Sequence, residues 1–248
     1  MTEVFNPFSL KGKTILVTGA SSGIGRGISI TSSKMGASIV VAGRNTSKLD
    51  ETLSMMEKGN HLKMICDLTK IRDLQDFVVK LPKLDGVVHC AGIGKRVLCK
   101  QLSDIDIETV MGINFNAPAL LQSELLRHKK INKDASIVFI ASIASWSPSI
   151  GNAVYSASKG AIISYAKCLS LELAPRQIRV NCISPAMVWT NLVLADGLDE
   201  EQLKEDEKKY PLKRYGTPED IANLAVYMLS DASSWMTGSN VIISGGIN

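Results

Sequence analysis

The fold is decided by the stretch Thr14–Gly25, which reads TILVTGASSGIG. Its first part, Thr14–Thr18, is short, apolar and partly β-branched, as a strand buried on both faces should be. The rest places glycines in the spacing G-x-x-x-G-x-G, directly before a helical pattern. Glycine permits a tight turn and lets the backbone approach a pyrophosphate, and the first amides of a helix offer hydrogen bonds to phosphate. A glycine loop between a first strand and a first helix therefore predicts a dinucleotide site.

The rest of the chain repeats this alternation of strand and helix. Alternating strands and helices predict βαβ units, and hence an α/β fold with a parallel sheet and helices on both faces. The predicted strands are Thr14–Thr18, Ser38–Ala42, Leu62–Cys66, Gly86–Cys90, Ser136–Ala141, Arg179–Ser184 and Asn240–Ile243. The predicted helices are Gly25–Met35, Ser47–Glu57, Ile71–Leu81, Ile107–Arg127, Val154–Leu173 and Pro218–Leu229.

No linker, repeat or change of composition divides the chain, so we expect one domain over residues 1–248. One segment, residues 191–211, interrupts the alternation between the sixth predicted strand and the last predicted helix. It is rich in Asp, Glu and Lys. We expect either a substrate lid over the carboxyl edge of the sheet or a solvated excursion without a role.

The composition is that of an ordinary globular protein, with 45% hydrophobic and 21% charged residues. A net charge of +4, without a dense Lys/Arg stripe and interleaved aromatics, argues against a nucleic-acid partner. No run approaches the ~20 apolar residues of a membrane span. Residues 1–10 include Glu3 and Pro7 and lack the apolar run of a secretory signal.

The cysteines are scattered, odd in number and without C-x-x-C spacing: Cys66, Cys90, Cys99, Cys168 and Cys182. This pattern fits reduced thiols in a cytoplasmic protein better than a disulfide framework or a zinc site. No other ligand cluster suggests a metal. Cys90 ends an apolar run, so we expect a small buried residue there rather than a nucleophile.

The end of the second predicted strand bears on the choice of cofactor. NAD sites usually place an acidic residue there to bond the ribose 2′-hydroxyl. This chain has Gly43, Arg44 and Asn45 instead, and a guanidinium suits a 2′-phosphate. NADP(H) is therefore predicted over NAD(H). Asp67 follows the third predicted strand, where it would reach an adenine amino group or cap the next helix, a role for which Thr69 competes.

Tyr155 and Lys159 stand four residues apart in the predicted helix Val154–Leu173. Residues at that spacing lie on one face of a helix, one turn apart. The lysine's charge favours the tyrosinate and should lower the phenol pKa from its ordinary value near ~10. Such a tyrosine exchanges a proton with an alcohol or a carbonyl near neutral pH. Ser142 follows a predicted buried strand, so its hydroxyl should emerge at the carboxyl edge and bond a carbonyl oxygen that gains charge.

Together these motifs resemble the short-chain dehydrogenase/reductase family, in its single-domain branch, from Lys11 to Gly246. The pattern is most similar to that of the 3-oxoacyl-thioester reductases. The resemblance implies a doubly wound Rossmann fold with seven parallel strands, hydride transfer with a nicotinamide cofactor, and a homodimer or homotetramer. The matching elements are Thr18–Gly25, Asp67, Ala91-Gly92, Asn114, Ser142, Tyr155, Lys159, Asn181, Pro185 and Thr190.

The resemblance also implies the roles of site residues. Ser142, Tyr155, Lys159 and Asn114 are its catalytic residues, with Asn114 in a water-mediated proton relay to Lys159, which also bonds the nicotinamide ribose. On spacing alone, an asparagine inside a helix is more often a packing or helix-bend residue. Thr190, with the backbone near Val188, would hold the nicotinamide carboxamide. The predicted cofactor-binding residues are Gly19, Ser21, Ser22, Gly23, Ile24, Gly25, Arg44, Asn45, Asp67, Leu68, Ala91, Gly92, Tyr155, Lys159, Pro185, Val188 and Thr190.

The chain departs from the family pattern at three places. His89 and Cys90 stand where Asn-Asn is usual before Ala-Gly, Ala186 replaces a glycine after Pro185, and Ser244 replaces an aspartate before the last glycine pair. The first two bear on how the cofactor is positioned, and the third bears on subunit contacts.

The predicted activity is interconversion of a ketone and a secondary alcohol, with a small carbonyl or alcohol molecule as substrate. A 3-oxoacyl thioester is one candidate substrate, with Arg176 and Lys129 either attracting an acidic acyl carrier or serving as ordinary surface charges. A sugar, a polyol or a steroid is the alternative within the same reaction class. An apolar pocket lined by Trp146, Trp189 and Ile93 would admit either kind.

A protein that senses a nucleotide without turnover is the alternative from another class, because fold alone does not settle function. The intact set of Ser142, Tyr155 and Lys159 speaks against it.

Overall fold

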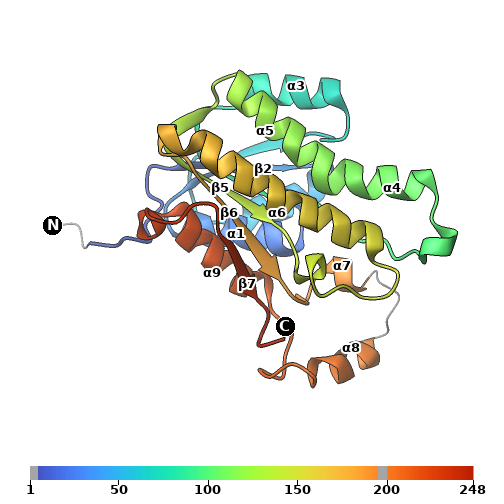
Figure 1. The fold of residues 1–248 in the computed structure, drawn as a ribbon. Coiled ribbons are helices and arrows are strands. Elements are labelled where there is room, and N and C mark those ends of the chain that lie inside the picture. The colour runs from blue at the N-terminus through green and yellow to red at the C-terminus, as the bar shows by residue number, and fades with distance from the viewer. Residues whose placement is uncertain (1–4, 195–199, 248) are drawn as a thin grey trace.

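The computed structural model describes residues 5–194 and 200–247. Seven parallel strands form one sheet in the order β3-β2-β1-β4-β5-β6-β7. The chain runs outward from β1 to β3, returns to place β4 beside β1, and runs outward again to β7 (Figure 1). This doubly wound order confirms the predicted fold, and it puts a ligand site at the carboxyl edge beside β1 and β4. The strands are β1 (Thr14–Thr18), β2 (Ser38–Gly43), β3 (Leu62–Ile65), β4 (Leu84–His89), β5 (Ile131–Ile140), β6 (Arg179–Pro185) and β7 (Asn240–Ile243).

Helices pack on both faces of the sheet. Helices α3, α5 and α6 supply one hydrophobic core, and α1, α2 and α9 supply the other. The helices are α1 (Gly23–Lys34), α2 (Thr46–Ser54), α3 (Ile71–Lys80), α4 (Asp104–Met111), α5 (Ala117–Arg127), α6 (Ala153–Leu173), α7 (Asn191–Leu194), α8 (Glu200–Glu207) and α9 (Pro218–Leu229). Short 3₁₀ turns cover Cys99–Gln101, Ile143–Ser145, Ala174–Arg176 and Asp231–Ser233.

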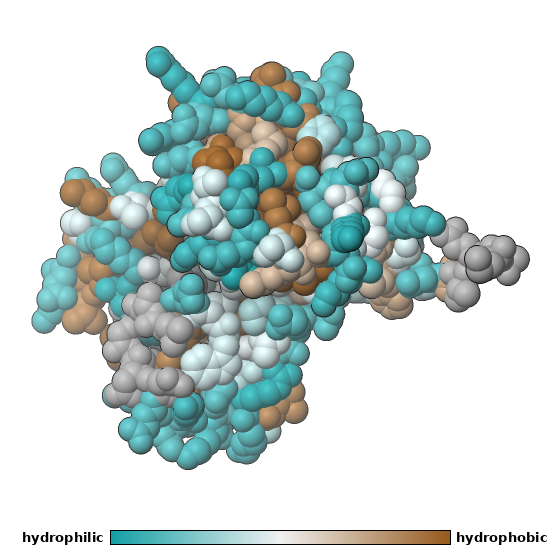
Figure 2. Space-filling view, turned by 180° about the vertical axis from the view of Figure 1, so that it is seen from behind, coloured by the Kyte–Doolittle hydropathy of each residue, from teal (hydrophilic) through white to brown (hydrophobic). Residues whose placement is uncertain are grey.

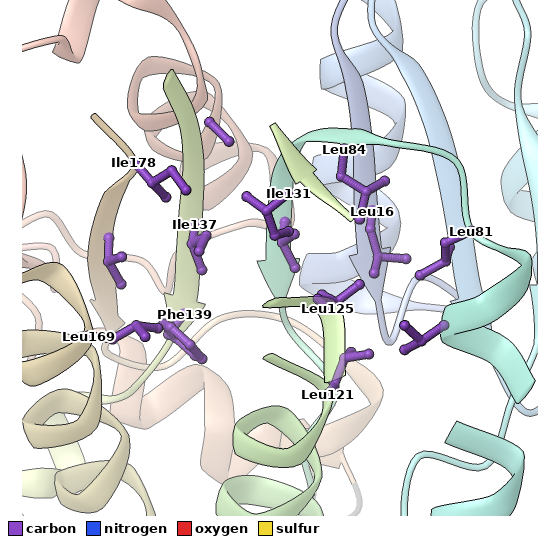
Figure 3. Packing of buried hydrophobic residues seen from close by; sticks show 14 of the residues in the cluster. Leu16, Leu81, Leu84, Leu121, Leu125, Ile131, Ile137, Phe139, Leu169 and Ile178 are labelled. Carbon is purple, nitrogen blue, oxygen red and sulfur yellow. The ribbon is translucent and has the colours of Figure 1, made fainter. Parts of the chain in front are cut away.

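Each central strand contributes side chains to both cores, because successive side chains of a strand point to opposite faces. On β5, Ile137 and Phe139 belong to the core under α5 and α6, whereas Val138 and Ile140 belong to the core over α1 and α9. Figure 3 shows the first of these cores, where side chains of α5 meet those of the strands. Burial on both faces explains why these strands are continuously apolar.

The helix predicted over Ile107–Arg127 ends at the predicted residue, but it has an earlier start and a π-helical segment in its interior. Helix α4 begins earlier, because Ser103 and Asp106 form a reciprocal capping box at its start. It ends at Met111, and a π-helical segment, Gly112–Asn116, joins it to α5. Asn114 therefore lies in a π turn, the kind of interruption that recurs at functional sites.

Residues 191–211 were expected to form a lid or a solvated excursion, and the part at 195–199 lies outside the described residues. On either side of that gap, α7 and α8 take up much of the segment. Four buried side chains, Val193, Leu203, Tyr210 and Tyr215, make a third small core here. These residues attach the segment to the strand that ends at Pro185 through Ala186, Met187 and Trp189.

The surface on the side opposite to the view of Figure 1 is largely hydrophilic, with hydrophobic residues in a band through its upper half (Figure 2). The edge strand β3 leaves Leu62 and Ile65 about half exposed, at 47% and 50%. Among the described helices, none combines the length and the apolar character needed to cross a membrane.

Candidate active site

A cleft of about 600 Å³ opens at the carboxyl edge of the sheet, where the loops after β1, β4, β5 and β6 converge. It brings together nearly all of the predicted site residues, although they lie far apart in the sequence. Asn45 and Asn114 are the two that do not line it. The predicted residues along its wall are Gly19, Ser21, Ser22, Gly23, Ile24, Gly25, Arg44, Asp67, Leu68, Ala91, Gly92, Ser142, Tyr155, Lys159, Pro185, Val188 and Thr190.

The glycine loop is packed too closely for side chains at two of its positions. Gly19 has φ +67°, and a Cβ atom there would lie 2.9 Å from the Cα of Ala91. A Cβ atom on Gly25 would lie 2.4 Å from the carbonyl oxygen of Gly19. Thr18 ties the same loops together, because its Oγ1 accepts hydrogen bonds from the backbone N–H groups of Cys90 (3.0 Å) and Ala91 (3.2 Å). The backbone of the loop is therefore what faces the cleft.

The start of α1 suits a phosphate group. Ser22 is the N-cap, and its side chain forms no capping hydrogen bond in the described structure. The first residues of α1, residues 23–25, line the cleft, so the amides that the cap leaves unbonded can bind a ligand there. Arg26 fixes the loop, since its guanidinium donates to the carbonyl oxygen of Ser21 at 2.7 Å and pairs with Glu51 at 2.8 Å. A dinucleotide pyrophosphate fits this cradle.

Arg44 and Asp67 lie at the end of the cleft beside β2 and β3, where the adenosine of a dinucleotide is expected. Asp67 accepts a hydrogen bond from the Thr69 hydroxyl at 2.7 Å, and this bond, with help from nearby Arg44 and Lys70, lowers the pKa of the carboxyl. The N-cap of α3 is Lys70, so the idea that Asp67 or Thr69 caps this helix is wrong. Asn45 caps α2 instead, accepting from the backbone N–H of residue 48 at 3.0 Å, which explains its absence from the cleft wall.

Ser142, Tyr155 and Lys159 meet at the other end. Ser142 follows β5, and its Oγ accepts from the N–H of Ala144 at 3.2 Å, so the hydroxyl proton can be donated into the cleft. Tyr155 and Lys159 lie one turn apart on α6, with the lysine Nζ 5.7 Å from the centre of the tyrosine ring. This contact holds a cation beside the phenol.

Lys159 is buried, with 6% of its surface exposed, and its Nζ donates to the carbonyl oxygen of Ile140 at 2.9 Å. Burial disfavours the ammonium form and lowers the pKa of Lys159 to about 8. Below that pH the side chain carries its charge, and near neutrality it can still favour the tyrosinate.

Asn114 is buried beneath the loop after β4 rather than in the cleft wall. Its side chain accepts from the N–H of Ile93 (2.9 Å) and donates to the Ile93 carbonyl oxygen (3.0 Å) and to the Ser158 hydroxyl (3.0 Å). It thereby joins the β4 loop to α6. A Cβ atom on Gly92 would lie 3.2 Å from its Oδ1 and 3.4 Å from the lysine Nζ, so Asn114 and Lys159 flank the same glycine.

His89 and Cys90, which depart from the family pattern, stand at the end of β4, and of the two only Cys90 lines the cleft. His89 is buried, stacks on Phe139 with ring centres 4.5 Å apart, and places Nε2 3.0 Å from the side-chain oxygen of Gln122. Burial lowers the pKa of His89 to about 4, so it is neutral at ordinary pH. Burial likewise raises the pKa of Cys90 to about 12, which agrees with an unreactive thiol.

The apolar residues expected to line a substrate pocket are only partly there. Ile93 lines the cleft, but Trp146 and Trp189 do not. The Trp189 ring packs on Tyr215 instead, with centres 5.3 Å apart. Arg96 and Asp206 also line the cleft, from a loop and a helix, and sequence reasoning missed them because neither stands in a recognisable motif.

Arg176 and Lys129, considered as attractors of an acyl carrier, lie at the amino end of the sheet in this chain. Arg176 follows α6 and donates to the carbonyl oxygen of Ile131 at 2.7 Å, at the start of β5. Because the cleft lies at the opposite edge, neither residue borders it within one copy of the chain. In the described residues, no group of three or more His, Cys, Asp or Glu side chains gathers as a metal site would.

Comparison with known proteins agrees with this geometry. The family model described as enoyl-(acyl carrier protein) reductase matches residues 19–248. A 3-oxoacyl-[acyl-carrier-protein] reductase of Rickettsia felis is 37% identical over 96% of this chain and 98% of its own length.

Two solved structures are similar over nearly their whole length. A short-chain dehydrogenase/reductase of the glucose/ribitol dehydrogenase type from Brucella melitensis has 31% identity and a TM-score of 0.91, covering 98% of this chain and 99% of that one. A gluconate 5-dehydrogenase from Beutenbergia cavernae with bound NADP has 31% identity and a TM-score of 0.87, covering 97% and 98%. With a matching family model, similar relatives over the full length and the predicted fold, the chain belongs to the short-chain dehydrogenase/reductase family and is an oxidoreductase of that family.

Proposed function

We propose that the protein interconverts a ketone and a secondary alcohol with NADP(H), using Tyr155 as the proton donor and acceptor. The observation that carries this proposal is the meeting of Ser142, Tyr155 and Lys159 in the same cleft as the glycine loop. A bound nicotinamide supplies the hydride for reduction or accepts it in the reverse direction. The residues of the chain then have to transfer one proton and stabilise one developing negative charge.

Each of the three residues has one task in reduction. Ser142 donates a hydrogen bond to the carbonyl oxygen and stabilises its growing charge. Tyr155 gives its phenolic proton to that oxygen, so the alcohol leaves neutral. Lys159 stays protonated and stabilises the tyrosinate that remains. Asn114 supports this set by fixing the loop beside Gly92, and a water relay from it to Lys159 stays a prediction.

The preference for NADP(H) is supported by the exposed Arg44 guanidinium at the adenosine end of the cleft. A 2′-phosphate accepts two parallel hydrogen bonds from such a group. The bound NADP of the Beutenbergia relative agrees with this choice. Ala91 and Gly92 would border the cofactor from the β4 side, and Pro185, Val188 and Thr190 from the β6 side.

For the substrate we propose a 3-oxoacyl thioester, the class named for the Rickettsia relative. A sugar, polyol or sugar acid is the second candidate, favoured by the names of the two solved relatives and by polar groups in the cleft wall. Those groups are Arg96, Ser147, Ser149 and Asn152, and the apolar ones are Ile93, Ile143, Met187 and Val193. A steroid is a third candidate within the same reaction class.

We further propose one domain over residues 1–248 with a substrate lid at about 191–211, assembled as a homodimer or homotetramer. The lid is supported by Asn191, Val193 and Asp206, which line the cleft. A cytoplasmic location is supported by the free state of all five cysteines.

The test is turnover by the parent and by Tyr155→Phe with NADPH or NADH and a panel of acetoacetyl thioesters, sugars and steroidal ketones. The variant should retain cofactor binding and lose about 10³-fold or more in kcat, as loss of a general acid implies. Near-normal turnover by Tyr155→Phe would refute the mechanism. Tighter binding of NADH than NADPH by the parent would refute the cofactor assignment.

A further inference from the structure

The segment Met187–Thr190 forms one wall of the cleft. Met187, Val188 and Thr190 line the cleft, whereas Trp189 between them is packed against Tyr215. The wall reaches across to the glycine loop, because the Thr190 methyl carbon lies 3.0 Å from where a Cβ atom on Gly23 would stand. A small shift of this segment would therefore change the width of the site where the nicotinamide end of the cofactor is proposed to lie.

The backbone of the segment is paired with a neighbouring loop. The N–H of Trp189 donates to the carbonyl oxygen of Gly216 at 2.9 Å, and the N–H of Gly216 donates to the carbonyl oxygen of Met187 at 3.0 Å. The wall and the loop that contains Gly216 therefore form one unit.

Glu207, near the end of α8, contacts both parts of this unit. Its Oε1 accepts a hydrogen bond from the Trp189 indole N–H at 2.7 Å and another from the backbone N–H of Tyr215 at 2.9 Å. Hydrogen bonds to a carboxylate are roughly twice as strong as those between neutral groups. The next residue toward the N-terminus, Asp206, holds the Tyr215 hydroxyl at 2.7 Å.

We propose that Glu207 is a positioning residue for the cofactor, which acts by holding Trp189 and, through it, Val188 and Thr190 against the cleft. This inference rests on the proposed function, in which those two residues border the nicotinamide. Without the carboxylate, the wall would keep its backbone pairing with Gly216, but the Trp189 indole and the Tyr215 N–H would lose their shared acceptor, and only the hydrogen bond from the Tyr215 hydroxyl to Asp206 would remain. The affinity for the cofactor should then fall while the fold persists.

The experiment measures the Kd of NADPH by its fluorescence, without any substrate, for the parent and three variants. Glu207→Leu removes the acceptor, and Glu207→Gln keeps a carbonyl oxygen that can accept both hydrogen bonds. Glu205→Leu is the matched control, because it removes a carboxylate from the exposed side of the same helix, where Glu205 pairs with Lys208. Thermal unfolding of each variant is followed in parallel.

Glu207→Leu should raise the Kd about tenfold, as the loss of a charge-assisted hydrogen bond would. Glu207→Gln and Glu205→Leu should stay within about twofold of the parent. A parent-like Kd in Glu207→Leu, an equal loss in Glu205→Leu, or a Glu207→Gln variant as weak as Glu207→Leu would each overturn the proposal. If Glu207 only stabilised the fold, Glu207→Leu would have a lower melting temperature, but its Kd for NADPH would not differ from those of Glu207→Gln and Glu205→Leu.

If Glu207→Leu does not fold, Trp189→Phe tests the proposal instead, because it removes the indole N–H that Glu207 binds and keeps an aromatic ring against Tyr215. A folded Trp189→Phe protein should bind NADPH about threefold more weakly, and unchanged binding would overturn the proposal. If the parent binds NADH more tightly, NADH replaces NADPH as the probe. Absence of carbonyl turnover would count against the proposed function alone, since the binding series needs no turnover.

Discussion

The two ends of the cleft differ in the kind of structural element that forms them. The proposed adenosine end is made of loop backbone and of exposed side chains such as Arg44, which a substitution can change without disturbing a core. The proposed chemical end is made of side chains set in long elements, with Lys159 of α6 buried against the end of β5. Because of this difference, we expect substitutions around Arg44 to alter the affinity for the cofactor. Substitutions around Lys159 should alter the rate of the chemical step.

After Tyr155→Phe, the largest effect that would sharpen this comparison is expected at Ser142. Ser142→Ala removes the donor that stabilises the carbonyl oxygen, and kcat should fall about 10²- to 10³-fold, as for other oxyanion donors. The Kd of the cofactor should change less than about twofold. Steady-state kinetics and a binding titration measure the two quantities.

Ser145→Ala is the control for Ser142→Ala. The Ser145 hydroxyl donates to the carbonyl oxygen of Ser142 at 2.8 Å, but Ser145 does not line the cleft. Ser145→Ala should keep kcat within about fivefold of the parent value, because only one local hydrogen bond is lost. Equal losses in both variants would mean that the turn after β5, rather than the Ser142 hydroxyl, matters for the rate.

The second effect belongs to the glycine loop. In Gly25→Ala the new methyl group would meet the carbonyl oxygen of Gly19 at 2.4 Å, so the loop has to move. The Kd of the cofactor should rise at least about tenfold, with a melting temperature lowered by several degrees, since strain of this kind costs roughly 1–3 kcal/mol.

Gly160→Ala in α6 is the matched change at the chemical end, where the nearest atom beyond the helix backbone is 3.9 Å away. Alanine is a better helix former than glycine, so this variant should gain about 0.5–1 kcal/mol in stability. Loss of stability in Gly160→Ala, or unchanged cofactor binding in Gly25→Ala, would contradict the expected difference between the two ends of the cleft.

Arg44→Ala should give a smaller, selective effect. Removal of the guanidinium is expected to lower the preference for NADPH over NADH about tenfold, equivalent to ~1.4 kcal/mol. The kcat with saturating cofactor should stay near the parent value. Titration of both cofactors measures the ratio, with Lys48→Ala on the exposed side of α2 as the control. A fall in kcat with no change in the ratio would contradict the assignment of Arg44 to the adenosine end.

The smallest expected effect is that of pH. Lys159 has its pKa lowered to about 8 by burial, so it is charged at pH 7 and largely neutral at pH 9. Loss of the cation removes the support for the tyrosinate, and kcat/KM for carbonyl reduction should fall about five- to tenfold across that interval. A profile that rises through pH 8 would show that the protonated lysine is not needed.

The sequence predicted the sheet well, because buried parallel strands are continuously apolar and the glycine loop fixes their first turn. β1 and β7 have the predicted bounds. The starts of β4 and β5 were missed, because a register shift between Leu84 and Gly86 lets both strands begin earlier than their apolar runs suggest. A local pattern holds no information about such a bulge.

The site was predictable where residue type and position carry the chemistry. Ser142, Tyr155 and Lys159 converge in the cleft because strand ends and helix turns fix their directions, although their roles stay predictions. Asn45 does not line the cleft, because its side chain caps α2, and its assignment to the cofactor stays a prediction. Trp189 was misjudged because tertiary packing on Tyr215, distant in sequence, decides which way it faces.

The π-helical segment Gly112–Asn116 holds one residue more than the α-helical turn it replaces, because its hydrogen bonds join residues five rather than four apart. A one-residue deletion there that restored α geometry would remove the extra residue and leave the flanking turns nearly in register. Leu121 and Leu125 would keep their places in the core that Figure 3 shows. The extra residue is therefore dispensable for the packing of α5, and the consequence of its loss falls on the contacts of Asn114 with Ile93 and Ser158.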